Sequence, residues 1–344
     1  MKVHFTTVIF LSFFFGWVGI DQPQLLFACP ACQNPNLPVV PNGTVFLDKG
    51  AIQWGTTLST SPIWVRHEAG CVTEANCQEA FIQPKHFHNQ FMLPMELRTN
   101  LDWGWSETFG ISVQIPIRLI YTTINYELPN GQSYEPLDAN IHHRNETLGG
   151  LGDGIFAIRL SKSFISGWWL ITRLGSSIPL GRTENNPFSV QAQKKEHQHI
   201  QMGTGTFDPF MSLALARRFS NWQSSLYGQA SIPLYENTKG FQGGVMTFVN
   251  AKLSYRLKQR SLLHLGLSWL RQGAEQWEGE VQQDGIYGRQ ELLLGLGTTF
   301  SFGGPQYSLN IQTPLWRELF QGSQTETGEL FAPLNLSLGI QGFL

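Results

Sequence analysis

Six of the histidines form three close pairs, and pairs of this kind can bind a metal ion. The pairs are His86/His88, His142/His143 and His197/His199, and His67 is a seventh histidine in the same part of the chain. Residues i and i+2 of a β-strand point to the same side, so His86/His88 and His197/His199 could each offer two imidazoles to one ion. Imidazole nitrogen suits Cu, Zn, Ni or Fe. The alternative is that polar loops simply contain histidine; apart from such a divalent metal we expect no cofactor.

The four cysteines also form two close pairs, Cys29 with Cys32 and Cys71 with Cys77. In an exported protein such pairs become disulfides, and we predict two local ones. Cys29-Pro-Ala-Cys32 is not a haem attachment motif, because Gln33 stands where that motif needs histidine. A redox-active or metal-binding Cys29/Cys32 pair is the alternative.

Enzyme motifs are missing from the sequence. It contains no G-x-S-x-G, no H-E-x-x-H and no phosphate-binding G-x-x-x-x-G-K. The glycine-rich residues 150–154 lack the dinucleotide-binding spacing, and no helical pattern follows them. We therefore expect no catalytic residues and no enzymatic activity.

The N-terminus indicates export. Lys2 supplies a positive charge, and the apolar run at residues 8–20 suits a signal-peptide core but is short for a transmembrane helix. We predict a signal peptide at residues 1–28 and a periplasmic N-terminal segment at residues 29–43. Cleavage after Ala28 would make Cys29 the first residue. Residues 26–29 loosely fit a lipoprotein box, although Phe27 is bulky where a small residue is usual.

The elements that carry these residues are predicted to be strands. At residues 109–121 the odd positions are apolar while the even positions are mostly small or polar, and similar period-two runs recur to the end of the chain. Charged residues make up only 14% of the sequence, against about 25% in typical soluble domains. These features favour an all-β fold at residues 44–344, a closed antiparallel transmembrane β-barrel of about twelve strands. A soluble β-sandwich or β-helix is the alternative.

The predicted connections alternate in length. Short turns fall near 103–107, 166–168, 220–222, 259–261 and 303–305, and long polar loops near 61–88, 125–150, 181–206, 236–243, 273–286 and 317–330. Short periplasmic turns and long external loops are typical of bacterial outer-membrane barrels. The expected location is thus the outer membrane, with lipid as a partner. The terminal strand ending in Phe343-Leu344 resembles the signal for the barrel assembly machinery. A net charge of −2 favours no nucleic-acid partner.

A proline recurs once in most outward-going strands, in the form x-Pro-[Ile/Leu]-x. The five prolines are Pro62, Pro116, Pro179, Pro233 and Pro314. Proline cannot donate to a sheet ladder, so we expect each one at a strand end or a bulge, near a long loop.

Two glycine-rich motifs add a family resemblance. Gly150-Leu151-Gly152-Asp153 opens one strand, and residues 203–209 (Gly-Thr-Gly-Thr-Phe-Asp-Pro) open another. With the proline pattern, they resemble a family of bacterial outer-membrane transporters named for the phenol meta-cleavage degradation pathway. That family is distantly similar to fatty-acid and aromatic-hydrocarbon channels. The resemblance implies a barrel over roughly residues 45–344 that passes small molecules, without establishing phenol as the solute.

Strand parity also predicts which charged residues face the lumen, since charges are costly against lipid. The predicted lumen residues are Glu96, Arg118, Arg159, Arg173, Arg218, Lys252 and Arg256. They could form a cationic constriction for small solutes or an internal salt-bridge network, and the two are compatible. We expect a porin-like channel. The alternative is a non-conducting barrel that binds metal through its external histidine pairs or scaffolds a periplasmic electron-transfer partner near Cys29/Cys32.

Overall fold

The computed structural model describes residue 37 and residues 47–69, 84–136, 144–164, 167–189, 196, 198–258, 260–282, 285–320 and 328–344. The regular structure within them consists of seventeen β-strands. None of it is a helix long and apolar enough to cross a membrane.

Several sequence predictions fall outside the described residues. The predicted signal peptide is one of them, and so are the members of both predicted disulfides, Cys29 with Cys32 and Cys71 with Cys77. The same holds for His142, His143 and His197. Both disulfides, Cys29 with Cys32 and Cys71 with Cys77, therefore stay predictions.

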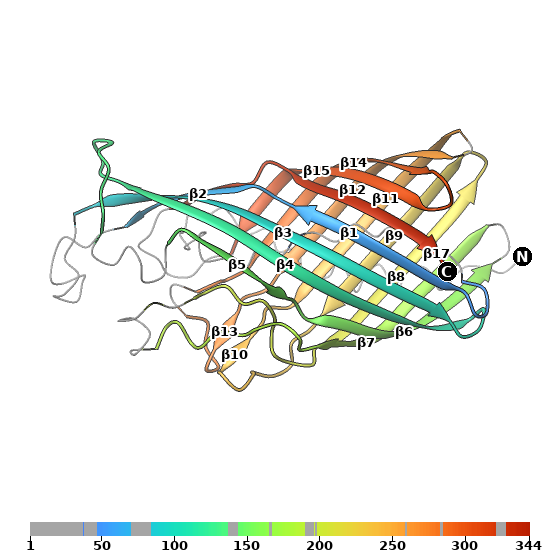
Figure 1. The fold of residues 1–344 in the computed structure, drawn as a ribbon, viewed down its shortest axis with the longest axis horizontal. Coiled ribbons are helices and arrows are strands. Elements are labelled where there is room, and N and C mark those ends of the chain that lie inside the picture. The colour runs from blue at the N-terminus through green and yellow to red at the C-terminus, as the bar shows by residue number, and fades with distance from the viewer. Residues whose placement is uncertain are drawn as a thin grey trace, which may run out of the picture.

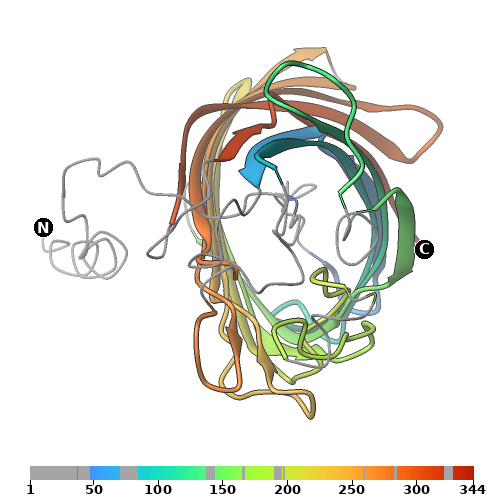
Figure 2. The same cartoon turned by 90° about the vertical axis from the view of Figure 1, so that its left-hand side faces the viewer.

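Twelve strands of the described chain close into one antiparallel barrel (Figure 1). They are β1 (Ile52–Thr60), β3 (His86–Gly104), β4 (Phe109–Glu127), β6 (Gly154–Phe164), β7 (Trp168–Ile178), β8 (Pro209–Phe219), β9 (Trp222–Ser231), β11 (Met246–Lys258), β12 (Ser261–Gln272), β14 (Arg289–Ser301), β15 (Gln306–Leu319) and β17 (Asn335–Phe343). The first strand, β1, pairs with β3 on one side and with the last strand, β17, on the other. Figure 2 shows the resulting ring. The predicted fold class is confirmed.

Three further strands extend the barrel wall on one side. They are β2 (Ile63–Ala69), β5 (Glu146–Leu151) and β16 (Gly328–Phe331). β2 pairs with the first residues of β3, β5 pairs with the middle of β4, and β16 pairs with β2. We call β16, β2, β5 and the adjoining parts of β3 and β4 (86–92 and 117–127) the flange. β10 (Phe241–Gln242) and β13 (Gln276–Trp277) form a separate small sheet.

The flange corrects part of the sequence prediction, because β2, β5 and the start of β3 lie where long loops were expected. β3 and β4 each have 19 residues, whereas a tilted strand needs about 9–11 residues to cross a membrane. The strands therefore continue as a sheet beyond the membrane, at the left of Figure 1.

The ends of the barrel have the predicted polarity. The backbone N–H of Leu344 donates to the carbonyl of Ile52 at 2.9 Å, so the beginning of β1 and the end of β17 lie together. The chain passes at this same, periplasmic end from β3 to β4, from β6 to β7, from β8 to β9, from β11 to β12 and from β14 to β15, each time within a few residues. The long connections and the flange lie at the opposite, external end.

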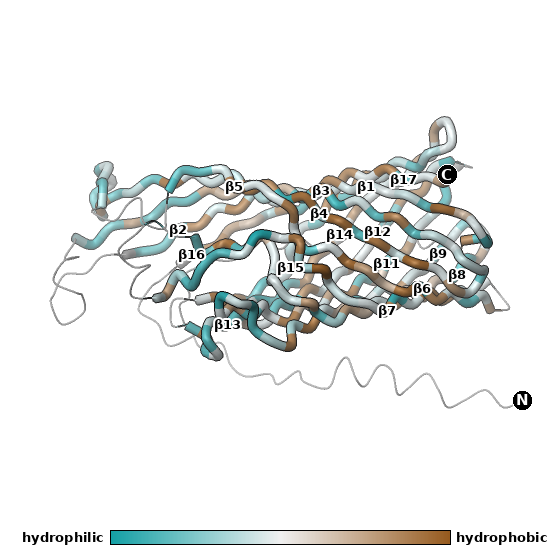
Figure 3. The backbone as a smooth tube through the Cα atoms, turned by 60° about the horizontal axis from the view of Figure 1, so that its bottom comes forward, coloured by the Kyte–Doolittle hydropathy of each residue, from teal (hydrophilic) through white to brown (hydrophobic). Residues whose placement is uncertain are grey.

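Alternation along the strands separates a lipid face from a lumen face. On β4, Phe109, Ile115 and Ile117 are exposed, whereas Gly110 and Pro116 are buried. Figure 3 shows hydrophobic and hydrophilic segments alternating along the barrel strands. Exposed apolar side chains around a closed barrel match the outward apolar band of outer-membrane proteins. The chain is accordingly a transmembrane barrel of the bacterial outer membrane.

The recurring prolines lie where strands change partner or leave the ladder. Pro116 falls between the part of β4 that pairs with β6 and the part that pairs with β5. Pro314 lies at a β-bulge, where Leu292 pairs with Trp316 and Leu293 with Pro314. Pro62 separates β1 from β2, and Pro179 and Pro233 follow the last residues of β7 and β9. A residue without an N–H fits each of these positions.

Candidate functional site

The charged side chains of the lumen form three groups, each with one carboxylate between two arginines. In the first group, Glu96 on β3 lies directly opposite Arg118 on β4, and Arg118 Nε is 2.9 Å from Glu96 Oε2. Arg98 binds the other carboxylate oxygen. Glu96 is only 5% exposed, so both of its oxygens are satisfied by guanidinium groups rather than by bulk water.

The second group lies nearer the periplasmic end and joins three strands. Arg173 Nη2 on β7 is 3.1 Å from Asp102 Oδ2 on β3. Arg159 on β6 is buried, pairs with Arg173 in the strand register, and interacts electrostatically with both Arg173 and Asp102.

The third group lies in the part of the wall formed by β14 and β15. Glu291 pairs in register with Arg317, whose Nη2 is 3.1 Å from Glu291 Oε2. Arg289 Nε is 3.0 Å from Glu291 Oε1. Arg317 also donates to the carbonyl of Ala332 at 3.2 Å, which links the group to the segment between β16 and β17.

The three groups share one charge balance. Each carboxylate is buried and faces two guanidinium groups, so each group keeps a formal surplus of one positive charge. Lys252 on β11 adds a further positive charge that is not neutralised, because no described carboxylate forms an ion pair with it. Its neighbour His264 lies between Ser254 Oγ at 2.8 Å and Thr299 Oγ1 at 2.7 Å. The residues of these three groups, together with Lys252, thus carry more positive than negative formal charge.

Most of the sequence-predicted lumen residues lie in or beside these groups. Arg256 shares the inner face of β11 with Lys252 and Ser254. Arg218 has the parity of the buried Ala214 and Ala216, but it is exposed beside the periplasmic turn. Four residues of these groups were not predicted from the sequence, namely Arg98, Arg289, Glu291 and Arg317. Parity alone could have found Arg98, which lies two residues from Glu96 on the same face.

The connection between β7 and β8 folds into the external mouth of the barrel. Ile200 and Met202 are buried against Ile120 and Leu148, on β4 and β5. Arg118 Nη1 donates to the carbonyl of Met202 at 3.1 Å, so the first charged group also holds this connection in place.

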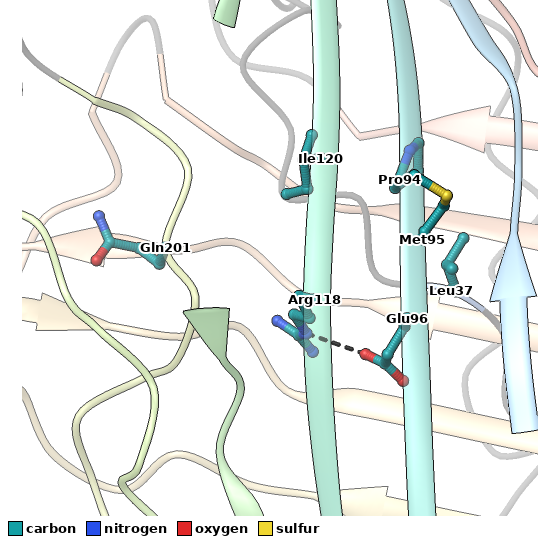
Figure 4. Close-up of a pocket in the computed structure, with 7 residues that line it drawn as sticks. All are labelled: Leu37, Pro94, Met95, Glu96, Arg118, Ile120 and Gln201. Carbon is teal, nitrogen blue, oxygen red and sulfur yellow. Dashed lines mark hydrogen bonds and ion pairs between the residues drawn. The ribbon is translucent and has the colours of Figure 1, made fainter. Parts of the chain in front are cut away.

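A cavity of about 10 Å³ lies at this point, which is room for roughly one water molecule, and Figure 4 draws the residues that line it. It is lined by Leu37, Pro94, Met95, Glu96, Arg118, Ile120 and Gln201. Leu37 belongs to the segment predicted at 29–43, and it is buried here inside the barrel. Leu47 is buried as well, near Gly104 at the periplasmic end.

The two glycine-rich motifs meet at the external rim. Asp153 Oδ2 accepts hydrogen bonds from the backbone N–H and the hydroxyl of Thr204, at 2.5 and 2.8 Å. The Thr204 hydroxyl is also 2.9 Å from Asp208 Oδ2. A Cβ atom on Gly203 would lie 2.1 Å from Asp153 Oδ1, so only glycine fits there. The hydrogen bonds between the two motifs thus hold the β7–β8 connection against the start of β6.

We call Asp153, Thr204 and Asp208 the rim cluster. Both of its carboxylates contact one hydroxyl, Thr204 Oγ1. A hydroxyl has one proton and can donate to only one of them at a time. Burial, opposed by hydrogen bonds from Thr206 and Thr204 and aided by the charge of Asp153, raises the pKa of Asp208 above its ordinary value of 3.8. A proton on Asp208 would satisfy the second contact.

The histidines fall into separate places. His67, His86 and His88 are buried together on the inner face of the flange. His199 packs against Phe188 in the β7–β8 connection, with ring centroids 5.2 Å apart. Within the described part of the chain, no group of three or more His, Cys, Asp or Glu side chains is placed to hold a metal ion without rearrangement.

The fold defines a class, the twelve-stranded outer-membrane barrel. Among solved structures, the chain is similar to an outer-membrane channel from Pseudomonas putida F1, with a TM-score of 0.57, 13% identity and coverage of 89% of this chain and 100% of that chain. It is more remotely similar to the P. putida toluene transporter TodX (TM-score 0.40, 11% identity, 86% and 91% covered) and to a Pseudomonas aeruginosa FadL homologue (TM-score 0.41, 8% identity, 85% and 89% covered). No family model and no curated protein matches the chain.

Proposed function

We propose that this protein is an outer-membrane channel for small molecules and that its lumen favours anionic or polar solutes. The observation that carries the proposal is the charge balance of the three arginine–carboxylate–arginine groups, each with one positive charge in surplus. Charged rings of one sign are a common source of ion selectivity in pores. The fold similarity to an outer-membrane channel supports the same class of function.

The narrow point of this channel is the first charged group. There Arg118 contacts Glu96 and the β7–β8 connection, and Leu37 fills part of the lumen beside it. A solute that passes this point meets the guanidinium groups of Arg98 and Arg118 at close range. Both side chains are partly shielded from solvent, so their charge acts more strongly than it would in bulk solution.

The test is ion selectivity in planar lipid bilayers. Purified protein under a KCl gradient should give a reversal potential of the sign for chloride preference. Lys252→Gln should reduce that preference without loss of folding, because Lys252 has no described ion pair to break. Arg118→Gln should reduce it further and change the conductance.

Arg218→Gln is the matched control, since it removes an equal charge from the exposed periplasmic end. It should leave selectivity nearly unchanged. Cation preference of the unaltered protein, or equal effects of Lys252→Gln and Arg218→Gln, would contradict the cationic lumen. A correctly folded barrel that never conducts would contradict the channel and favour the binding or scaffolding alternative.

A further inference from the structure

We propose that His67, His86 and His88 form a binding site for one divalent transition-metal ion, Cu²⁺ or Zn²⁺, on the inner face of the flange. The proposal is independent of the channel function. In the strand register, His67 on β2 pairs directly with His88 on β3, and His88 pairs on its other side with Tyr126 on β4. His86 lies two residues along β3 from His88, on the same face.

The imidazoles converge. His86 Nε2 and His88 Nε2 are 3.0 Å apart, and the ring centroids of His67 and His88 are 4.4 Å apart. The three residues are only 2%, 3% and 8% exposed. Two nitrogens that both bind a zinc ion at about 2.0–2.1 Å in a tetrahedral site lie little more than 3 Å from each other. The spacing of His86 and His88 is already close to that value.

The protonation of His86 suits a metal ligand. Its Nδ1 lies 2.8 Å from the carbonyl oxygen of Pro84, which can only accept a hydrogen bond. Nδ1 must therefore carry the proton, which leaves Nε2 of the neutral ring with a lone pair directed at His88. A backbone carbonyl that fixes the other ring nitrogen in this way is the usual outer partner of a metal-binding histidine.

The surroundings favour a cation of intermediate softness. The inner-face positions near the three histidines carry Val65, Gln90, Ile124 and Tyr126, and the ring of Tyr134 is tilted against that of His86 with centroids 4.9 Å apart. None of these side chains is basic, so nothing among them repels a cation. None is a carboxylate either, which disfavours Ca²⁺ and Mg²⁺, whereas imidazole suits Zn²⁺ and Cu²⁺.

An apolar layer separates this site from the basic lumen. Ile63, Val65, Met92 and Ala332 pack together below the histidines. His88 and Glu96 are eight residues apart along β3, which is about 26 Å of extended strand. A metal ion at the histidines is therefore distant from the first arginine group. To complete the site, the ring of His67 must turn so that one nitrogen faces the other two, since the present arrangement does not yet enclose an ion.

The test uses purified full-length protein in detergent micelles, titrated calorimetrically with Zn²⁺ and separately with Cu²⁺. We expect one site of micromolar or tighter affinity for at least one of the two ions, and none of comparable affinity for Ca²⁺ or Mg²⁺. His86→Gln and His88→Gln should each weaken binding about 100-fold, and His67→Gln by at least about 10-fold. X-ray absorption of the loaded protein should show nitrogen ligands at about 2.0–2.1 Å.

His199→Gln is the matched control, because it removes an imidazole from the same end of the barrel but outside the cluster. It should leave this affinity unchanged. Unaltered protein that binds neither ion better than millimolar would overturn the proposal, and so would full affinity in the His86→Gln/His88→Gln double variant. If that variant does not fold, diethyl pyrocarbonate labelling of unaltered protein decides the question. Bound metal must protect His86 and His88 from modification, and equal labelling with and without metal would also overturn the site.

Discussion

The two halves of β4 have their apolar side chains on opposite faces of the strand. From Phe109 to Tyr121 the outward side chains are large and apolar, and the inward side chains include Ser112, Gln114 and Arg118. Beyond Tyr121 the outward positions become Thr123, Asn125 and Glu127, while the inner face, which is already apolar at the buried Ile120, carries the buried Ile124. Near Tyr121, therefore, the apolar face passes from the outside of the strand to the inside.

The change of face indicates where lipid ends. An aromatic residue at the boundary fits the interfacial girdle of outer-membrane barrels. Below it, the lumen tolerates paired charges because they are enclosed and neutralise each other in part. Above it, the same sheet meets water outside and packs apolar and imidazole groups inside, as a soluble sheet does. One pair of strands thus carries both a charged lumen and a protected histidine cluster.

Glu96→Gln should have the largest effect on the lumen half. It leaves two partly buried guanidinium groups without the buried carboxylate that pairs with them, and breaking a buried ion pair in this way costs about 3–5 kcal/mol. The free energy of unfolding from urea titrations in micelles measures this loss. Glu68→Gln in the flange is the control, because its pair with Lys85 is partly exposed and should contribute less than about 1 kcal/mol. Equal losses would show that the two regions do not differ as described.

The lipid boundary can be located with arginine. Ile117→Arg places a charge on the apolar outer face and should cost about 2–4 kcal/mol, whereas Asn125→Arg, only eight residues further on the same face, should cost about 0–1 kcal/mol. Unfolding free energies in lipid vesicles provide the measurement. A large cost at Asn125 would move the membrane boundary outward and remove the distinction between lumen half and flange half.

The smallest effect concerns the rim cluster and depends on pH. The pKa of Asp208 is raised in the folded protein, so the folded state holds this proton more tightly than the unfolded state does. Stability from this group is complete below pH 3.8 and falls as the pH rises through the raised folded value. The slope is at most about 1.4 kcal/mol per pH unit. Across this range the unfolding free energy of the unaltered protein, minus that of Asp208→Asn, should fall; a constant difference would contradict a raised pKa of Asp208.

Much of the barrel could be predicted from the sequence because lipid imposes a strict rule. Every wall strand must alternate apolar and lumen-facing residues, so the period-two run at 109–121 and the short turns revealed the strands. The flange could not be predicted in this way, because beyond Tyr121 the outer face is no longer apolar. Residues 61–88 were therefore predicted to be a long polar loop, although residues 63–69 form β2 and β3 begins at His86.

For the charged groups, too, only part of the arrangement could be predicted from the sequence. Parity placed Glu96, Arg118, Arg159 and Arg173 on the inner face, but it did not show which side chains pair with each other. Asp102 meets Arg173, 71 residues away in the chain, only because β3 and β7 are brought to one side of the lumen. Such contacts depend on the tilt and stagger of the closed barrel, which no single strand encodes.

The pairing between β1 and β17, which closes the barrel, has a consequence for how the protein folds. Ser59 and Ser337 are 278 residues apart in the chain, yet their hydroxyls lie 3.0 Å apart across this seam. Elsewhere in the ring, each wall strand pairs with the next wall strand along the chain, so these pairs can form locally. Until residues 335–343 arrive, however, the wall is an open ribbon with two unpaired edges, and open edges invite pairing with other chains. The last strand, β17, has nine residues and closes the barrel. A chain that lacked it would be an open, aggregation-prone sheet rather than a smaller barrel.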